Sequence, residues 1–177
     1  MLKKTAVFLL FITLCLAVLG SFLTKEFEVE QSIEIKADAN LIHLYVNDLK
    51  QWPKWTPWHA RNQDLKITYG NVTRGVGATQ SWKSKQGNGR LKITVSSPAN
   101  GIAYDIYFEN NQTPSISAIQ YQSIADELTR VTWRIHGEVD VPIIGSYIAM
   151  FVEHITSDMY QTGLQNIKLI VEKKNTS

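Results

Sequence analysis

The sequence is poor in the side chains that most often carry protein chemistry. Its 177 residues include a single cysteine, Cys15, which lies inside an apolar run near the N-terminus. The rest of the chain therefore has no thiol for a disulfide, a zinc site or a nucleophile. The four histidines do not combine with one another or with carboxylates at the spacings typical of metal sites. We expect no metal, no cofactor and no catalytic residue set that can be named from sequence.

An excess of charge of one sign is also missing. The chain holds 18 Lys and Arg against 16 Asp and Glu, and without Lys3 and Lys4 the remainder is 16 against 16. Because a nucleic-acid-binding surface is normally strongly basic, we expect no nucleic acid as a partner. A hydrophobic fraction of 44% and a charged fraction of 19% argue against disorder. The length suits one domain with a substantial core.

A long run without charge occurs at the N-terminus, where residues 5–23 follow Lys3 and Lys4. This length is close to the minimum for a helix that crosses the hydrocarbon core of a bilayer, about 30 Å. Gly20 and Ser21 form a poor signal-peptide cleavage site. We therefore interpret residues 1–24 as a membrane anchor or signal segment and expect an N-terminal transmembrane helix. The lysines favour a single-pass inner-membrane protein whose domain, residues 25–177, lies on the periplasmic or extracytoplasmic side.

Proline is absent after Pro142, and the stretch that follows predicts a long helix. From residue 143 to 173 apolar residues recur at helical spacing, and polar residues occupy the opposite side. Such a helix would be about 45 Å long. It would not be stable alone in water and needs a surface to pack on. Its predicted apolar stripe consists of Ile144, Ile148, Phe151, Val152, Ile155, Met159, Ile167 and Ile170.

The chain before this helix predicts mainly strands. Residues 27–36 alternate between apolar and polar side chains, as in a half-buried strand. Asp38 or Asn40 is a candidate cap for a short helix over residues 41–49. Between residues 65 and 139, six further short strands are separated by turn sequences. We predict an α+β fold in which a curved antiparallel sheet of about seven strands wraps on the long C-terminal helix.

This order of elements resembles a known superfamily. Strand, short helix, six-strand meander and closing helix form the helix-grip arrangement of the START/SRPBCC proteins. Within that superfamily the chain is similar to the bacterial polyketide cyclase/dehydrase and lipid-transport type. The resemblance implies a hydrophobic cavity between the sheet and the long helix that holds a lipid or another apolar small molecule. The segments that match are 27–35, 46–52, 55–58, 75–78 with Trp82, 129–133 and 163–172.

Three tryptophans form the densest aromatic cluster, at a turn set by Pro53 and Pro57. Trp52, Trp55 and Trp58 are stiff, bulky rings with an indole N–H as a polar group. A position of some rings at the bilayer surface is disfavoured, because no Lys or Arg cluster lies nearby, and two interpretations remain. The rings either plug one end of the core or form a gate that touches a ligand.

Strand alternation places further aromatic and apolar side chains on the inner face of the sheet. Such a lining suits an apolar ligand, and it suits a close-packed core equally well. Gly163 on the long helix allows either close contact with the sheet or space for a ligand. The candidate ligand-binding residues are Trp52, Trp55, Trp58, Tyr69, Trp82, Tyr104, Ile106, Phe108, Trp133, Ile135, Phe151, Ile155, Met159 and Gly163.

Three functional hypotheses follow. The leading one is a membrane-tethered domain that binds or carries a hydrophobic small molecule or lipid without chemical turnover. The second is an enzyme of the cyclase or hydrolase kind, with Tyr104, His59 or Gln31 as polar groups in the cavity. The third is an envelope interaction module with a filled core. His43, on the short helix, has no obvious partner in the sequence.

Overall fold

A single antiparallel sheet of seven strands dominates the described part of the chain. The computed structural model describes residues 4–5, 10–11, 14–15, 18–20, 22–109, 113–142 and 144–175, apart from the side chain of His59. The strand order is β1-β7-β6-β5-β4-β3-β2, so β2 to β7 form a meander and β7 then pairs with β1. The elements are β1 (Glu26–Ile35), α2 (Ala39–Val46), η1 (Leu49–Lys54), α3 (Trp58–Arg61), β2 (Lys66–Tyr69), β3 (Thr79–Lys83), β4 (Gly89–Ser97), β5 (Gly101–Phe108), β6 (Ser115–Ala125), β7 (Leu128–Glu138) and α4 (Gly145–Asn175).

This architecture confirms the predicted sheet and closing helix. In β1 the side chains alternate along the strand as the sequence indicates, with Phe27, Val29 and Ile35 buried. Of the two candidate caps, Asp38 begins α2, where its Oδ1 accepts a hydrogen bond from the Asn40 backbone N–H at 2.7 Å. A carboxylate at this position satisfies an amide that has no partner within the helix.

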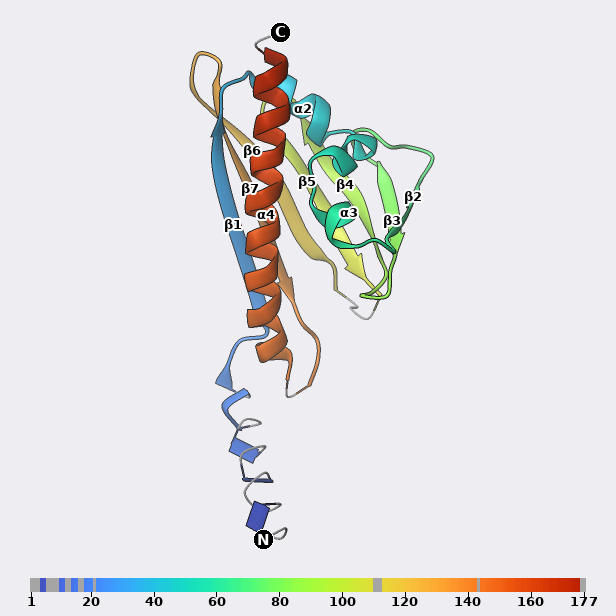
Figure 1. Ribbon diagram of the computed structural model, residues 1–177, viewed down its shortest axis with the longest axis vertical. Helices are drawn as coiled ribbons and strands as arrows, with labels where there is room; N and C mark the ends of the chain where they lie inside the picture. The colour runs from blue at the N-terminus through green and yellow to red at the C-terminus, as the bar shows by residue number, and fades with distance from the viewer. Residues whose placement is uncertain are drawn as a thin grey trace.

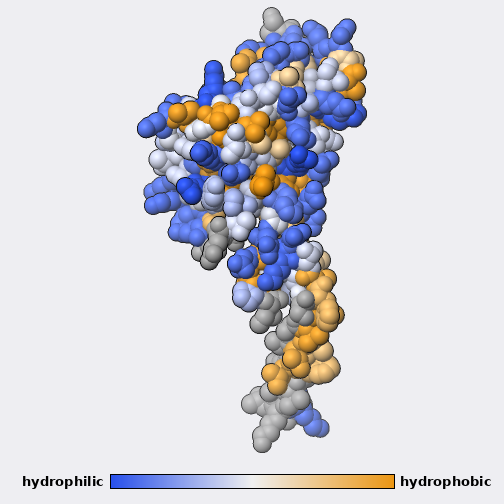
Figure 2. Space-filling model, turned by 180° about the vertical axis from the view of Figure 1, so that it is seen from behind, coloured by the Kyte–Doolittle hydropathy of each residue, from blue (hydrophilic) through white to orange (hydrophobic). Residues whose placement is uncertain are grey.

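The helices cover one face of the sheet, which we call the inner face. Figure 1 shows α4 lying along the side formed by β1, β7 and β6, and α2, η1 and α3 lying over the side formed by β5 to β2. The opposite, outer face is mostly hydrophilic, with scattered apolar side chains (Figure 2). The core therefore lies between the inner face and two different sets of helices, α4 on one side and α2, η1 and α3 on the other.

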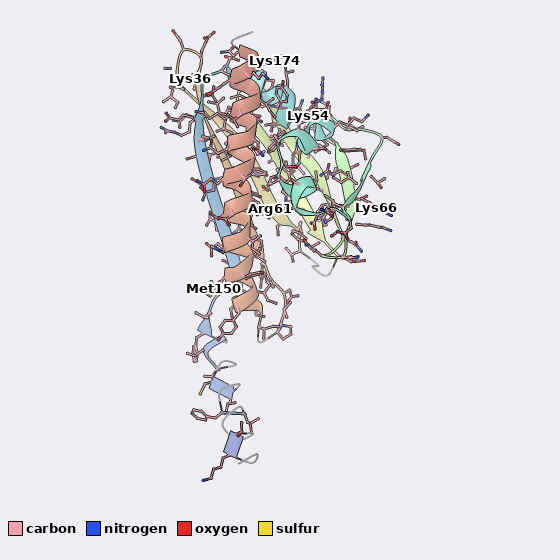
Figure 3. All side chains as sticks on the ribbon, viewed as in Figure 1. Lys36, Lys54, Arg61, Lys66, Met150 and Lys174 are labelled. Atoms are coloured by element: carbon pink, nitrogen blue, oxygen red, sulfur yellow. The ribbon has the colours of Figure 1, made fainter. Side chains whose placement is uncertain are left out.

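Hydrogen bonds hold α4 against the rest of the domain along its length. Gln31 of β1 donates its Nε2 hydrogen to Ser157 Oγ at 2.9 Å, and Asn166 Nδ2 donates to the Trp55 carbonyl at 3.0 Å. At the C-terminal end, Glu172 Oε1 accepts from the Lys36 backbone N–H at 2.8 Å. Figure 3 shows Lys36 and Lys174 at this end of the molecule and Met150 near the opposite end of α4.

The buried face of α4 is rotated from the predicted apolar stripe. Phe151 is 64% exposed and Ile155 is 36% exposed. Small residues at the contact allow the helix to lie close to the sheet. This close approach determines which face of the helix is buried, and the positions of the largest apolar side chains do not. The buried residues of α4 are Gly145, Ser146, Ala149, Thr156, Tyr160, Gly163, Leu164, Ile167 and Val171.

One strand also departs from simple alternation. The pairing of β4 with β5 shifts register between Ile93 and Val95. An extra residue at such a bulge changes the face to which the following side chains point. Val95, which alternation predicts on the inner face, is therefore 54% exposed.

The predicted transmembrane helix is not supported. Among the residues with described placement, no helix is both long and apolar enough to cross a membrane. Residues 6–9, 12–13, 16–17 and 21 of the run 5–23 lie outside the described residues. A spanning helix needs about 20 apolar residues in succession. The predictions of an N-terminal membrane helix and of a single-pass inner-membrane location are therefore wrong.

Candidate ligand pocket

The space beneath α4 is filled by aromatic rings. Trp133 of β7 stacks on Tyr160 of α4 with ring centroids 3.9 Å apart and planes 9° apart. Trp55 meets Trp133 edge-on at 5.2 Å. None of these three side chains is more than 2% exposed. A Cβ on Gly163 would lie 2.8 Å from Trp133 Cζ3, so this glycine makes the close helix-to-sheet contact.

A buried chain of hydrogen bonds runs through this filled region. Trp133 Nε1 donates to Tyr104 Oη at 2.9 Å, and Ser117 Oγ donates to the Arg134 carbonyl at 2.7 Å. Tyr160 Oη lies 3.2 Å from Ser117 Oγ. Burial raises the pKa of Tyr104 to about 12 and raises the pKa of Tyr160 well above its ordinary value. Both phenols are therefore neutral at physiological pH.

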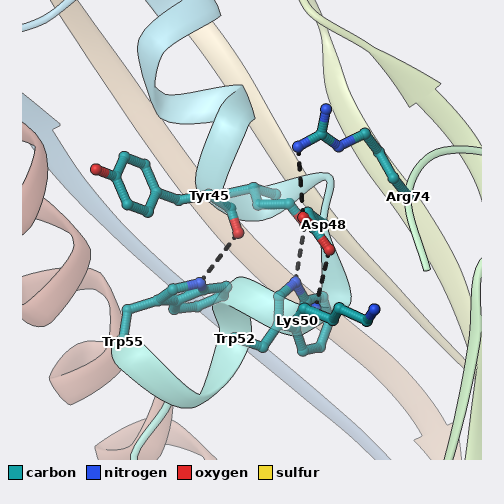
Figure 4. A network of polar contacts seen from close by, with 7 residues as sticks. Tyr45, Asp48, Lys50, Trp52, Trp55 and Arg74 are labelled. Atoms are coloured by element: carbon teal, nitrogen blue, oxygen red, sulfur yellow. Dashed lines mark hydrogen bonds and ion pairs between the residues drawn. The ribbon is translucent and has the colours of Figure 1, made fainter. Parts of the chain in front are cut away.

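The segment that carries Trp52, Trp55 and Trp58 covers the other part of the inner face, and we call it the roof. Trp52 Nε1 donates to the Val46 carbonyl at 2.8 Å and Trp55 Nε1 to the Tyr45 carbonyl at 3.2 Å, so both indoles are anchored to the end of α2 (Figure 4). Both side chains are 1% exposed, in agreement with the interpretation of a core plug. Trp58 stacks on Trp52 at 6.0 Å and remains only partly buried.

Asp48 fixes the start of this roof. Its Oδ1 accepts from the Lys50 backbone N–H at 3.0 Å, and its Oδ2 lies 3.4 Å from Arg74 Nη2 (Figure 4). The first contact caps η1, and the second ties η1 to the loop before β3. The position of the roof over the sheet is therefore set by both local and long-range contacts.

A pocket of about 230 Å³ lies between the α3 segment and the inner faces of β2 to β5. Strand pairing brings the lining residues of this pocket together. Ile67 is opposite Trp82, Gln80 is opposite Leu91, and Leu91 is opposite Ile106. The lining consists of Trp58, Asn62, Leu65, Ile67, Gln80, Trp82, Ser84, Gln86, Gly87, Leu91, Tyr104, Ile106 and Phe108.

The lining is apolar with a few neutral polar groups. Among its described side chains there is no Asp, Glu, Lys, Arg or His. Arg61, the last residue of α3, and Lys66, the first residue of β2, are exposed and do not line the pocket (Figure 3). Gln80 is 6% exposed, and its Oε1 has no hydrogen-bond partner among the described residues. The arrangement suits an uncharged, mainly apolar molecule.

The candidate residues predicted from sequence divide between this pocket and other places. Trp58, Trp82, Tyr104, Ile106 and Phe108 line the pocket. Those in the filled core are Trp52, Trp55, Trp133, Ile135 and Gly163, and those on α4 outside the pocket are Phe151, Ile155 and Met159.

Several pocket residues were missed by the sequence-based set. Gln80 precedes Trp82 by two positions on β3, so strand alternation could have placed both side chains on the inner face. The same alternation placed Ile67 and Leu91 on the inner face, although they were not among the candidate ligand-binding residues. The remaining residues belong to the loops after α3 and β3, and no periodic signal points to them: Asn62, Leu65, Ser84, Gln86 and Gly87.

A second hollow, of about 450 Å³, lies against the outer side of β2 to β5. Tyr69 is among its lining residues, but its side chain is opposite Gln80 on the inner face and packs against the core. The walls of the hollow include the exposed side chains of Ser81, Arg90 and Lys92. Arg90 lies over the ring of Tyr107 at 4.3 Å. This open, polar surface is less suited than the inner pocket to an apolar ligand.

The polar groups suggested for catalysis do not gather in the pocket. Tyr104 lines it, Gln31 is bonded to Ser157 beneath α4, and the His59 side chain lies outside the described residues. His43, for which the sequence offers no partner, is buried between Tyr121 and Ser96. In the described part of the chain no three His, Cys, Asp or Glu residues lie close enough to hold a metal ion.

Solved structures of similar fold come from several bacteria. A hypothetical protein of Helicobacter pylori has a TM-score of 0.62 at 10% identity, with 81% of this chain and 87% of that chain covered. A protein of Thermobifida fusca has a TM-score of 0.62 at 16% identity, with 82% and 93% covered. A protein of Chromobacterium violaceum has a TM-score of 0.55 at 14% identity, with 82% and 98% covered. At these identities the likeness concerns the fold alone.

A comparison with curated proteins finds no significant match. The sequence from residue 26 to 172 matches the family described as polyketide cyclase / dehydrase and lipid transport. The match spans every strand of the sheet and almost all of α4. It confirms the resemblance drawn from the sequence motifs and suggests hydrophobic ligand binding. The chain therefore belongs to the polyketide cyclase / dehydrase and lipid transport family.

Proposed function

We propose that this protein binds a small hydrophobic molecule in the pocket under α3, as a carrier or binding protein that does not transform it. The observation that carries the proposal is the pocket itself, with aromatic and aliphatic walls and neutral polar groups. Removing apolar ligand surface from water would supply the binding free energy, at about 25 cal/mol per Å².

The size of the pocket bears on the class of ligand. Its volume of about 230 Å³ lies below the roughly 300–1,000 Å³ of pockets that enclose drug-sized molecules. A long-chain lipid would leave much of its surface outside. The ligand that fits best is therefore a compact apolar molecule, such as one with one or two fused rings.

Calorimetric titration of the full chain with 1-methylnaphthalene tests the proposal. We expect saturable binding at one site and an increase in melting temperature with ligand concentration, because a ligand that binds only the folded state stabilises it. Heat that never saturates, together with an unchanged melting temperature, would contradict the proposed function.

Two matched variants locate the site. Ile106 is 8% exposed and lines the pocket, so Ile106→Trp should fill the pocket and weaken binding at least about tenfold. Ile116, on the neighbouring strand β6, is 58% exposed, and Ile116→Trp should leave binding unchanged. Equal effects of the two substitutions would place the ligand elsewhere.

A further inference from the structure

The amide of Gln80 is the unusual polar group of the pocket. It lies on the inner face of β3, between the β2 residue Tyr69 and the β4 residue Leu91 in the register of the sheet. Its side chain is almost completely buried, and Oε1 has no hydrogen-bond partner among the described residues. A buried carbonyl oxygen without a donor is costly, so natural proteins seldom leave one without a purpose.

Two other polar groups of the pocket lining, the hydroxyls of Tyr104 and Ser84, already have partners. The Tyr104 hydroxyl accepts from Trp133 Nε1, and Ser84 Oγ donates to the Gly87 carbonyl at 3.0 Å. Gln80 Oε1 therefore has acceptor capacity to offer a molecule in the pocket. Rotation about the last side-chain torsion of glutamine is broad and of low cost, so the oxygen can turn toward a ligand.

We propose that Gln80 selects the ligand: its amide oxygen accepts a hydrogen bond from a small, uncharged, mainly apolar molecule that carries one hydroxyl or N–H group. This inference rests on the proposed function, because it requires the pocket to be a ligand site. It adds the chemical class of the ligand and the residue that recognises it.

The uncharged character of the ligand follows from the walls. A carboxylate in this pocket would lose water and gain no cationic partner from the described lining side chains. The exposed positions of Arg61 and Lys66 leave their charges in water, where attraction is screened. An alcohol or an N–H donor loses less hydration and regains a hydrogen bond at Gln80.

Three probes of one shape separate these properties. 1-Naphthol carries a hydroxyl donor, 1-methylnaphthalene replaces that donor by a methyl group, and 1-naphthoate carries a negative charge. The quantity to measure is the ratio of the dissociation constants of 1-methylnaphthalene and 1-naphthol, in the full chain and in its variants. Dividing this ratio in the unmodified protein by the same ratio in a variant isolates the contact between one side chain and one ligand group.

We expect Gln80→Met, which keeps length and removes the acceptor, to lower this ratio about tenfold. Gln122→Met, at an exposed position on β6 outside the pocket lining, should leave the ratio unchanged. We also expect 1-naphthoate to bind the unmodified protein at least about tenfold more weakly than 1-naphthol. Melting curves of each variant establish that it is folded.

The outcomes distinguish the two proposals. A ratio that is the same in the unmodified protein and in Gln80→Met would overturn the role of Gln80, while saturable binding of 1-methylnaphthalene would still support the pocket. Tighter binding of 1-naphthoate than of 1-naphthol would overturn the uncharged ligand class. Absence of saturable binding by all three probes would overturn the proposed function and this inference together.

Discussion

The two halves of the inner face use similar residues and reach different results. Under α4, Trp133 and Tyr160 stack face to face, and Gly163 lets the helix lie against them. Under α3, Trp58 and Trp82 border a pocket of about 230 Å³. The first cover is a continuous helix of 31 residues, and the second combines a four-residue helix with loops. A long helix can press along the whole sheet, whereas a short, proline-interrupted segment leaves space beneath it.

The largest expected effect tests this contrast by removing one tryptophan from each half. Trp133 is fully buried, and Trp133→Ala should lower the free energy of unfolding by about 3–5 kcal/mol. Trp82 is only partly buried at the pocket, and Trp82→Ala should cost about 1–2 kcal/mol. Urea denaturation of both variants measures the two losses. Equal losses would mean that the two halves are packed equally well.

The sequence predicts the elements of the fold better than it predicts the pocket. Periodicity at residues 27–36 and after Pro142 reflects local geometry, so β1 and α4 can be predicted with no knowledge of their neighbours. Whether Trp133 lines a cavity or fills one depends on Gly163 and Tyr160, which are about 30 positions away in the chain. Empty space is a property of several elements together, and composition does not record it.

The rotation of α4 shows a second limit of sequence-based prediction. Phe151 and Ile155 look like core residues by spacing and are exposed, while Thr156 and Gly163 are buried. Contact with the sheet selects small residues that permit close approach, and hydrophobicity alone does not indicate them. Gln80 was missed for a related reason: alternation with Trp82 places it on the inner face, but a set chosen for apolar side chains leaves out a polar residue.

A second prediction concerns the close contact in the filled half. Gly163→Ala places a methyl group 2.8 Å from Trp133 Cζ3, against a stacked and buried ring. Overpacking should outweigh the gain of about 1 kcal/mol in helix propensity, for a net loss of about 1–2 kcal/mol. The control is Gln161→Ala, at an exposed position on the same helix, which should change stability little. Thermal and urea unfolding measure both; a stabilised Gly163→Ala variant would mean that α4 is free to move away from the sheet.

A smaller effect is expected at the roof, which covers the half of the sheet that holds the pocket. Asp48 caps η1, and Asp48→Ala should cost about 1 kcal/mol. Asp48→Asn retains an oxygen for the Lys50 amide and should cost less. Arg74→Met removes only an ion pair whose arginine side chain is 60% exposed, so it should cost about 0.5 kcal/mol or less. If Arg74→Met were the most damaging of the three, the ion pair rather than the cap would hold the roof.

The smallest expected effect is a pH dependence at the junction of the two halves. His43 of α2 lies between Tyr121 on β6 and Ser96 on β4, with Nδ1 at 3.4 Å from Tyr121 Oη and Nε2 at 3.3 Å from Ser96 Oγ. Ser96 Oγ donates its hydrogen to Asn47 Oδ1 at 2.7 Å. His43 Nε2 must then be the donor to Ser96, and Nδ1 accepts from Tyr121. This arrangement requires the neutral imidazole.

Burial lowers the pKa of His43 below its ordinary value of 6.5. Well above pH 6.5 neither the folded nor the unfolded state carries a proton on this imidazole, and its contribution to stability is complete. As the pH falls below 6.5, the unfolded state takes up the proton first, so stability is lost until the lower pKa of the folded state is passed. Urea unfolding at pH 7.5 and 5.5 should therefore show a smaller difference in His43→Gln than in the unmodified protein. Leu44→Gln, an exposed neighbour on α2, should retain the full difference. An equal difference in all three proteins would mean that water reaches His43, and that the contacts joining α2 to both halves of the sheet are looser than their burial indicates.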